Sequence, residues 1–259
     1  MLFQTDSPSR LVIGATAFLF DRNAENVGGD ALREFSMTET IAARALTLDS
    51  GPGSATARLI LAHGAGSGMS ATILEVVSEL LAERGVAVTR FEFQYMAQRR
   101  QGGSRRPPPP VEKLAAEFVV CLEEVRAGSA RHQRIFIGGK SLGGRVASLI
   151  ADRAFRDRHI EGLICLGYPF HPVGKPAQLR IAHLTELTCP TLIVQGVRDP
   201  FGSRGEVEAM PLSDRIRFHW AADGDHDLGP RGNSGFTRKQ NLTAAADAVK
   251  SFMASLSDA

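Results

Sequence analysis

The sequence predicts an α/β fold in which a mostly parallel, twisted sheet carries helices on both faces. Past residue 40, short runs rich in Val and Ile alternate with longer amphipathic stretches, and this alternation is typical of repeated strand–helix units. The chain has 259 residues, of which 43% are hydrophobic and 22% are charged. A chain of this length and composition is expected to form one globular domain with a core of its own.

The N-terminal forty residues fit this alternation worst, so we divide the chain into an N-terminal extension, residues 1–40, and an α/β domain, residues 41–259. Within the extension, the apolar run at 11–20 is a candidate edge strand. This run is too short to span a bilayer, and no small-residue cleavage site follows it. We therefore expect neither a membrane segment nor a signal peptide.

Charge and cysteine content argue against several classes of protein. The formal net charge of +2 gives no reason to expect nucleic-acid binding. The three cysteines show neither metal-ligand spacing nor a disulfide framework; they are Cys121, Cys165 and Cys189. We therefore expect a protein of a reducing, cytoplasmic compartment without a metal or another cofactor.

The first half of the domain divides at its glycines and prolines. We expect strands at 43–48, 57–61 and 86–93, and helices at 70–84 and 111–126. Gly85 stands just beyond the first of these helices, where glycine favours the end of a helix. Residues 94–110 contain a glycine pair and four prolines, so we expect a long loop there.

The second half continues the same alternation up to the C-terminus. We expect strands at 134–137, 160–166, 191–195 and 215–219, and helices at 142–153 and 237–256. A connector at 168–189 separates two of these strands. Since parallel strands place their carboxyl ends at one edge of the sheet, the loops that follow them are expected to converge.

One segment points to nucleophilic catalysis, because a predicted strand runs directly into RIFIGGKSLGG at 134–144. Its centre matches G-x-S-x-G, with Ser141 flanked two positions away by Gly139 and Gly143. A serine on a sharp strand-to-helix turn needs small residues at both positions, because the tight backbone leaves no room for side chains. The following helix directs its first amides at the site, so the Leu142 N–H is a candidate oxyanion donor.

Two other interpretations of this pentapeptide are open. Gly139-Lys140-Ser141 matches the end of a phosphate-binding loop, but Arg134 stands where that motif begins with glycine, and the residues between form a strand. The second alternative is a tight turn without a catalytic role, because Gly and Ser are common in turns.

A serine hydroxyl needs a neighbouring base, and that base needs an anionic group to orient it. Asp199 lies in the loop after the strand at 191–195, and His226 lies in the loop before the last helix. Their order along the chain, serine then acid then histidine, is the order in which G-x-S-x-G hydrolases carry these residues. We therefore expect Ser141 as the nucleophile, His226 as the general base and Asp199 as its partner.

Each assignment has a rival. His219 could serve as the base, although it stands inside a predicted strand, and Asp199 and His226 could be ordinary polar residues of turns. Three further acids lie beside the histidine and could orient it; they are Asp223, Asp225 and Asp227. The glycine-containing turn and the chain order favour Asp199.

A second oxyanion donor is expected in the glycine-rich loop at 62–68, which follows the strand at 57–61. The Ala65 N–H is the first candidate, with Gly66 as the alternative. We expect His63 to brace this loop and not to act as a catalyst, because His226 already occupies the position of the base. A plain strand-to-helix connection is the alternative for the whole loop.

Together these residues resemble the α/β-hydrolase superfamily, and within it the dienelactone-hydrolase-like branch. The chain is most similar to a small family that shares the strings HGAGSGM, GGKSLGGR, YPFHPVGKP, QGVRDPFG and GDHDL, spread over roughly residues 43–256. That family includes bacterial hydrolase-like proteins, a testis-expressed eukaryotic protein and a non-specific-lethal subunit of a chromatin-bound acetyltransferase complex. The resemblance implies an α/β-hydrolase fold and a Ser-His-Asp triad, and it leaves the substrate open.

We accordingly expect a serine hydrolase that cleaves an ester, a thioester or an activated amide of a small acyl compound. A non-catalytic binding or scaffold protein with the same fold is the alternative. Many relatives carry a helical cap after the sixth strand, whereas only 168–189 is available here, so we expect a minimal cap and an open site. We expect a monomer or homodimer with no nucleic-acid or membrane partner.

The loop at 94–110 carries a cluster of arginines on the expected active face. These cations could attract an anionic substrate together with lysines from two other segments; they are Arg99, Arg100, Arg105, Arg106, Lys140 and Lys175. The alternative is a solvated loop whose arginines serve solubility.

Overall fold

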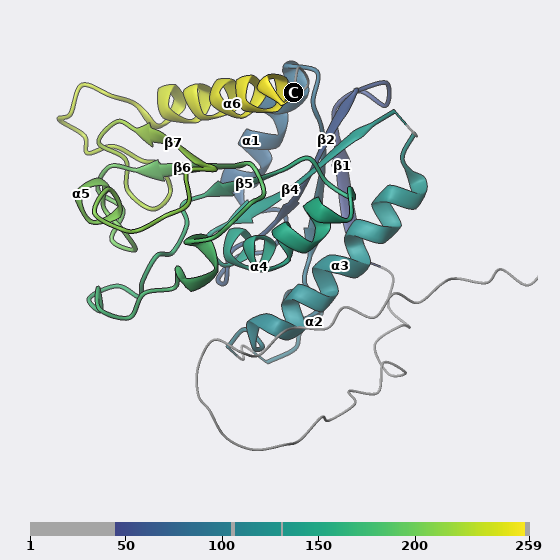
Figure 1. Cartoon of the computed structure of the whole chain (residues 1–259), viewed down its shortest axis with the longest axis horizontal. Coiled ribbons are helices and arrows are strands. Elements are labelled where there is room, and N and C mark those ends of the chain that lie inside the picture. Colours follow the sequence, from purple (N-terminus) through teal and green to yellow (C-terminus); the bar gives the residue numbers. More distant parts are fainter. Residues whose placement is uncertain (1–44, 105–106, 131, 257–259) are drawn as a thin grey trace, which may run out of the picture. The chain divides into compact units, whose positions relative to one another are not determined.

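The computed structural model describes residues 45–104, 107–130 and 132–256, and within them seven strands form one sheet in the order β1-β3-β2-β4-β5-β6-β7 (Figure 1). β1 is antiparallel to β3, and every other neighbouring pair is parallel. The strands are β1 (Leu46–Ser50), β2 (Ala57–Ala62), β3 (Ala87–Glu92), β4 (Arg134–Lys140), β5 (Gly162–Leu166), β6 (Thr191–Gly196) and β7 (Ile216–Ala221). The predicted mostly parallel sheet is confirmed.

Helices cover both faces of the sheet, as predicted. On one face, α1 and α6 pack their apolar side chains against the sheet, and on the other face α3 and α4 do so (Figure 1). The described helices are α1 (Thr72–Glu83), α2 (Gln94–Arg100), α3 (Val111–Gly128), α4 (Leu142–Arg156), η2 (Ala182–Leu184), α5 (Arg204–Val207) and α6 (Arg238–Ser255).

The central strands are buried on both faces of the sheet, which explains why their sequences are nearly continuous apolar runs. Every residue of β5 and of β6 is buried. β1, in contrast, lies at the edge of the sheet and exposes Leu46 and Leu48. Its antiparallel pairing to β3 places the turn after it beside the start of β3, where Ser50 faces Val88.

The prediction of one long loop at 94–110 was wrong for its first part, because Gln94–Arg100 forms helix α2. The glycines and prolines that argued for a loop all come after Arg100, so they end this helix without preventing it. The Phe93 carbonyl accepts the Ala97 N–H at 3.1 Å, and Met96 is buried on the inner face of the turn.

The short helix α5 was not predicted from the sequence, although its start carries a capping box. The Ser203 N–H and hydroxyl both donate to the Glu206 carboxylate, at 2.8 and 2.6 Å. The predictions for residues 1–40, and for Arg105 and Arg106, lie outside the described residues.

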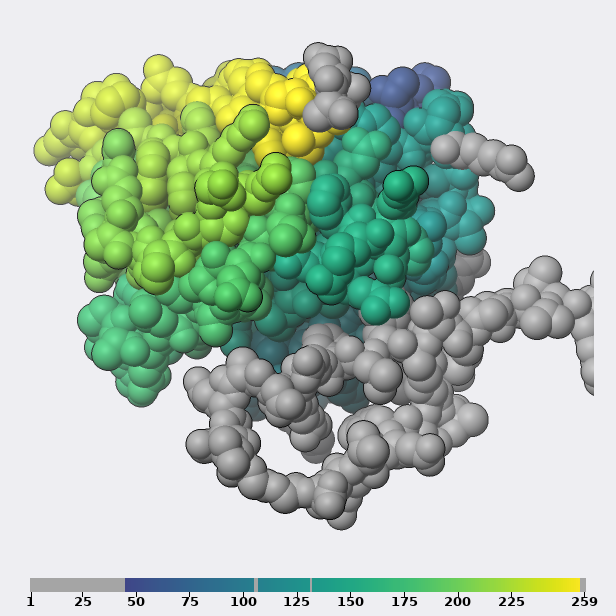
Figure 2. All heavy atoms as spheres, in the orientation of Figure 1, coloured from purple at the N-terminus to yellow at the C-terminus, as the bar shows by residue number. Residues whose placement is uncertain are grey.

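The surface in Figure 2, drawn in the orientation of Figure 1, shows that green segments, which include the chain after β5, form a broad part of this face. None of the described helices combines the length and the hydrophobicity needed to cross a bilayer. The three cysteines are buried thiols within the described chain. Burial raises the pKa of Cys121 to about 12.

Candidate active site

Ser141 stands at the turn between β4 and α4, where the backbone adopts an unusual conformation. Its φ is 52° and its ψ is −115°, in a region that side chains other than that of glycine rarely occupy. The Ser141 N–H donates to the Leu166 carbonyl at 2.9 Å, which ties the turn to the end of β5. The serine therefore sits on a sharp, held turn at the carboxyl edge of the sheet.

The two glycines around Ser141 are required by backbone contacts. A Cβ at Gly139 would lie 2.4 Å from the carbonyl carbon of Gly143, and a Cβ at Gly143 would lie 2.6 Å from the carbonyl oxygens of both Ala62 and His63. Real Cβ contacts essentially never come that close. The turn thus accepts only glycine at these positions, for the reason that the sequence pattern suggested.

The structure brings together the three residues that the sequence singled out. The Ser141 Oγ lies 2.9 Å from His226 Nε2, and His226 Nδ1 lies 2.8 Å from Asp199 Oδ2. Asp199 follows β6, and His226 follows β7, so both loops leave the same edge of the parallel sheet as the serine turn. With its Nδ1–H on the carboxylate, the imidazole presents Nε2 to the hydroxyl as an acceptor.

The Asp199 carboxylate is fully buried, and both of its oxygens accept hydrogen bonds from groups other than His226. Oδ1 accepts the Phe201 N–H at 2.9 Å, and Oδ2 accepts from the Gln195 amide at 2.9 Å. The Phe201 ring also packs on His226, with 4.3 Å between ring centroids. These contacts set the orientation of both the acid and the imidazole.

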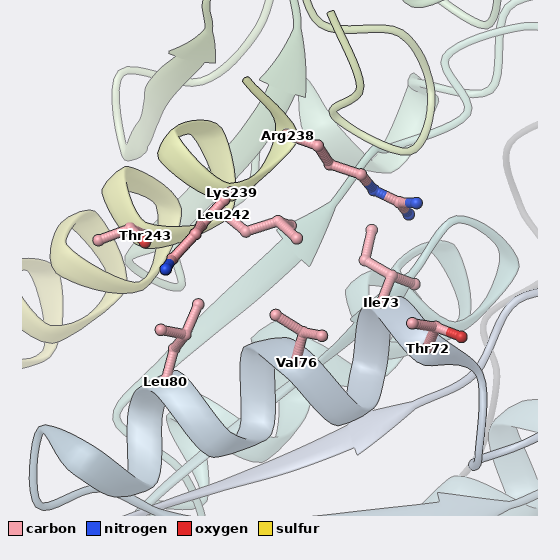
Figure 3. Close-up of a pocket in the computed structure, with 8 residues that line it drawn as sticks. All are labelled: Thr72, Ile73, Val76, Leu80, Arg238, Lys239, Leu242 and Thr243. Atoms are coloured by element: carbon pink, nitrogen blue, oxygen red, sulfur yellow. The ribbon is translucent and has the colours of Figure 1, made fainter. Parts of the chain in front are cut away.

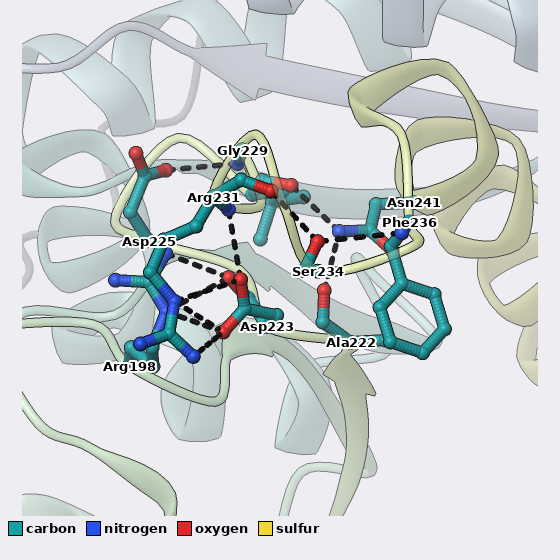
Figure 4. A network of polar contacts seen from close by, with 10 residues as sticks. Arg198, Ala222, Asp223, Asp225, Gly229, Arg231, Ser234, Phe236 and Asn241 are labelled. Carbon is teal, nitrogen blue, oxygen red and sulfur yellow. Dashed lines mark hydrogen bonds and ion pairs between the residues drawn. The ribbon is translucent and has the colours of Figure 1, made fainter.

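The other acids of the histidine loop are engaged elsewhere (Figure 4). The Asp223 carboxylate pairs with Arg198 at 2.8 Å and with Arg231 at 2.6 Å. Hydrogen bonds from the Arg231 side chain and backbone, aided by the charge of Arg198, lower the pKa of Asp223 to about 2. Asp225 Oδ1 accepts the Asp227 and Gly229 N–H groups, so it shapes the loop.

Helix α6 supports the loop that carries His226 through the buried side-chain amide of Asn241. The Asn241 Nδ2 group donates to the Ala222 carbonyl at 3.0 Å and to the Leu228 carbonyl at 2.8 Å (Figure 4). The two carbonyls lie on either side of His226 in the chain. Asn241 therefore clamps both arms of the loop that presents the imidazole.

Two of the cations expected to bind substrate have acidic partners in the fold. Lys140 is buried, and its ammonium lies 3.2 Å from Asp227 Oδ1; burial lowers the pKa of Lys140. Arg100 lies 3.0 Å from the buried carboxylate of Glu92. Each of these two charges therefore has a partner within the fold, and their binding of an anionic substrate stays a prediction. Arg99, another of the expected cations, lies over the ring of Tyr95, with its guanidinium carbon 5.3 Å from the ring centroid.

His63 braces the glycine-rich loop, as expected. Its Nδ1 lies 2.7 Å from the Gly64 carbonyl, and its Nε2 accepts the Phe93 N–H at 3.1 Å. Burial lowers the pKa of His63, which agrees with a neutral ring that donates from one nitrogen and accepts at the other. The ring thereby links the loop after β2 to the end of β3.

The candidate oxyanion donors lie on the two segments that border Ser141. Leu142 is the first residue of α4, so its N–H has no acceptor within the helix. In the other segment, a Cβ at Gly64 would lie 3.7 Å from the Ser141 Cβ, and Ala65 and Gly66 follow as exposed residues. The Tyr95 hydroxyl supports this loop by donating to the Ala65 carbonyl at 3.2 Å.

Sequence reasoning missed Gln195 and Tyr95. Gln195 is fully buried. It lies near the end of a mostly apolar strand, four positions before the acid, and this position in the sequence was a usable signal. Tyr95 was hidden because α2 had been assigned to a loop.

A family model described as an alpha/beta hydrolase domain matches residues 55–254, and the chain therefore belongs to this family. The fold also occurs in an alpha-beta serine hydrolase homologue from Coxiella burnetii, with a TM-score of 0.60 and 19% identity over 79% of this chain and 89% of that chain. A dienelactone hydrolase from Anabaena variabilis gives a TM-score of 0.60 and 21% identity over 82% of this chain and 91% of that chain.

A third similar structure is a serine hydrolase without a lid from Xanthomonas campestris, with a TM-score of 0.56 and 16% identity over 81% of this chain and 92% of that chain. At these identities the likenesses establish the α/β-hydrolase fold.

A groove of about 360 Å³ lies between α1 and α6, on the face of the sheet opposite to α4 (Figure 3). Its walls are mostly apolar, with Arg238 and Lys239 at the start of α6. None of the predicted site residues lines this groove.

Proposed function

We propose that this protein is a serine hydrolase that cleaves an ester, a thioester or an activated amide through an acyl-enzyme on Ser141. The observation that carries the proposal is the continuous contact from Ser141 Oγ through the imidazole of His226 to the buried carboxylate of Asp199, at 2.9 and 2.8 Å. A hydroxyl, a base and an anionic partner in this geometry are what acyl transfer at neutral pH needs.

In the first half of the reaction, the Ser141 oxygen attacks the acyl carbon while His226 Nε2 takes the hydroxyl proton. The new oxygen–carbon bond produces a tetrahedral intermediate, and the imidazolium is stabilised by the Asp199 carboxylate. When the bond to the leaving group breaks, His226 donates the proton to that group. Asp199 stays ionised throughout, because its role is to hold the imidazole and balance its charge.

The negative charge of the tetrahedral intermediate needs preorganised donors. We propose the Leu142 N–H and the Ala65 N–H for this task, with Gly66 as the alternative to Ala65. Backbone donors of this kind contribute about 3 kcal/mol each to transition-state stabilisation, because they need no reorganisation during the reaction.

In the second half, water takes the place of the leaving group. His226 removes a proton from the water, the hydroxide attacks the acyl carbon, and the proton passes to the Ser141 oxygen as the acid is released.

The chain after β5 runs from Tyr168 to Cys189 with one 3₁₀ turn, which is too little to form a closed lid. We propose an open site that accepts varied small acyl compounds.

The test is covalent labelling with a fluorophosphonate probe, which reacts with activated serines. We expect the parent chain to be labelled, Ser141→Ala to be unlabelled, and Ser251→Ala, an exposed serine of α6, to be labelled like the parent. Hydrolysis of short-chain aryl esters, acyl thioesters and lactones by the same proteins then identifies the substrate class. A folded parent that neither labels nor hydrolyses any of these would favour the non-catalytic binding alternative.

A further inference from the structure

Two arginines lie on adjoining segments, one in the first turn of α4 and one in the chain that follows β5. Arg145 lies in the first turn of α4, and its N–H donates to the Ser141 carbonyl at 3.0 Å. The serine turn lies at the N-terminal end of this helix, and helical side chains generally lean in that direction. Arg180 belongs to the chain after β5, where its N–H donates to the Phe170 carbonyl at 2.8 Å.

A chain of hydrogen bonds links the backbones of these two arginines. The Ser148 hydroxyl donates to the Arg145 carbonyl at 2.7 Å and lies 2.8 Å from His183 Nε2. The Tyr168 hydroxyl lies 3.5 Å from the same nitrogen and donates to the Arg180 carbonyl at 2.9 Å. The backbones of the two arginines are therefore linked through side chains of α4, η2 and the chain after β5.

The histidine in this chain is not a cation. Burial, together with the charge of Arg145, lowers the pKa of His183 to about 4. A neutral ring that carries its proton on Nε2 can donate to the Ser148 oxygen, whose own proton is used on the Arg145 carbonyl. His183 is therefore a neutral link between the two segments. The Asp152 carboxylate also lies within electrostatic range of this ring, and its Oδ1 accepts the Thr188 and Cys189 N–H groups.

Neither guanidinium has an acidic partner among the residues that the structure describes. The Arg145 Nε atom is buried and lacks a hydrogen-bond partner there. Burial, and next the charge of Arg145, lower the pKa of Arg180. Two half-buried cations that repel each other are costly unless an anion lies with them. This differs from Arg100 and Lys140, which are each paired with a carboxylate.

We propose that Arg145 and Arg180 form a subsite for an anionic group, a carboxylate or a phosphate, carried by the acyl part of the substrate that Ser141 attacks. The inference rests on the proposed function, because it defines which esters the same site prefers. Guanidinium groups suit both anions, since their planar donors pair with two oxygens at once. The first turn of α4 adds the partial positive charge of a helix N-terminus.

The position of Arg145 sets the length of the acyl chain. Four residues of helix rise by about 6 Å, so an anion at Arg145 stands roughly that far along the helix axis from the nucleophile, and the arginine side chain extends the reach. A dicarboxylic half-ester with four methylene groups between its carbonyl carbons spans such a distance. Mono(4-nitrophenyl) adipate is therefore the test substrate, and 4-nitrophenyl 6-methylheptanoate is its neutral isostere.

The kinetic test compares kcat/KM for the two esters, at low salt, in the parent, Arg145→Gln, Arg180→Gln and Arg156→Gln. We expect each of the first two variants to lower kcat/KM for the adipate ester about 10- to 100-fold and to leave the neutral ester within about twofold. Arg156 is an exposed arginine at the far end of α4, so its variant should match the parent. Equal losses on both esters, or no loss on either, would overturn the subsite.

A binding measurement separates this inference from the proposed function. Calorimetry with Ser141→Ala follows binding of the adipate half-ester without turnover, with Arg145→Gln added in a double variant and with inorganic phosphate as a competitor. Binding that needs Arg145 in a chain that never hydrolyses any ester would keep the subsite and reject the hydrolase. Hydrolysis of both esters without any effect of the arginines would do the reverse. Competition by phosphate identifies the subsite as one for phosphate as well as carboxylate.

Discussion

Gln195 connects the acid of the site to the chain that follows β5. Its amide nitrogen donates to Asp199 Oδ2 at 2.9 Å and to the Tyr168 carbonyl at 3.1 Å, while its oxygen accepts the Tyr168 N–H at 2.7 Å. All of these groups are buried, so water cannot replace a lost partner. The single side chain therefore sets both the acid and the start of the segment that bears Arg180.

Replacing Gln195 by methionine, which is similar in size but has no amide, should lower both catalytic efficiency and stability. We expect kcat/KM for a neutral ester to fall about tenfold and the free energy of unfolding to fall by about 1–3 kcal/mol, because buried groups lose their hydrogen bonds. Kinetics and urea denaturation measure the two effects. Gln178→Met, on an exposed residue, is the control and should change neither. An unaltered rate in a Gln195→Met protein would show that the acid needs no such support.

Asp223 provides a prediction about pH. Because its folded pKa is lowered to about 2, below the value of about 3.9 for an unfolded aspartate, its ion pairs with Arg198 and Arg231 stabilise the fold above the unfolded value. That stabilisation is lost as the pH falls through about 2. Asp223→Asn should therefore lower the urea midpoint at pH 7, and the difference from the parent should shrink between about pH 4 and pH 2.

The matched control for this pH series is Asp214→Asn, on an exposed aspartate before β7. It should show a smaller effect at neutral pH and no comparable trend. A difference between Asp223→Asn and the parent that is the same at every pH would contradict the ion-pair explanation, since a purely steric effect does not titrate.

Among the elements, the turn between β4 and α4 is a tight junction at the carboxyl edge of the sheet. Gly143 lets the first turn of α4 lie against the carbonyl groups at the end of β2, and Gly144 lets it lie against Cys165 of β5. The close approach is what places the Leu142 amide and the Ser141 hydroxyl on the same edge. Packing of the helix and geometry of the nucleophile are thus set by the same residues.

Gly143→Ala should disrupt this junction. Its Cβ would lie 2.6 Å from two backbone oxygens, which cannot move as a flexible side chain could. We expect a loss of at least about 1–3 kcal/mol in the free energy of unfolding, together with loss of fluorophosphonate labelling. Gly128→Ala, at the end of α3 with open space around the new Cβ, is the control and should unfold no earlier than the parent. Normal labelling of Gly143→Ala would contradict the steric argument.

At the scale of the whole molecule, the described chain holds two apolar clusters, one on each face of the sheet. α3 and α4 complete the first, and α1 and α6 complete the second. Both clusters, and all residues proposed for catalysis and anion binding, fall within 45–256. We therefore predict that the α/β domain folds and acts without residues 1–42.

A chain that begins at Ala43 tests this directly. We expect its thermal midpoint to lie within about 3 °C of the parent, which corresponds to about 1 kcal/mol for a domain of this size, and its kcat/KM for a neutral ester to lie within about twofold. Differential scanning calorimetry and ester hydrolysis measure the two. A clearly lower midpoint, or a loss of activity in a folded protein, would show that residues 1–42 belong to the working domain.

The class of fold and the three residues at the centre of the candidate site could be predicted from the amino-acid sequence. Apolar periodicity is a local property that survives in the sequence, so strands and helices could be placed within a few residues of β2, α1 and α4. The direction of parallel strands then required that Ser141, Asp199 and His226 lie at one edge. No side-chain geometry was needed for that step.

Which charges and amides meet depends on the packing of the folded chain and could not be predicted. Lys140 pairs with Asp227 and Arg100 with Glu92, whereas Arg145 lies near Arg180 and forms no ion pair among the described residues. Such pairings join segments far apart in the chain, and each depends on how helices and loops pack over the sheet, which leaves no periodic trace in the sequence. Helix α2 was not predicted for a related reason. The glycines and prolines that follow it in the sequence favoured a loop, whereas burial of Met96 in the folded protein stabilises the helix.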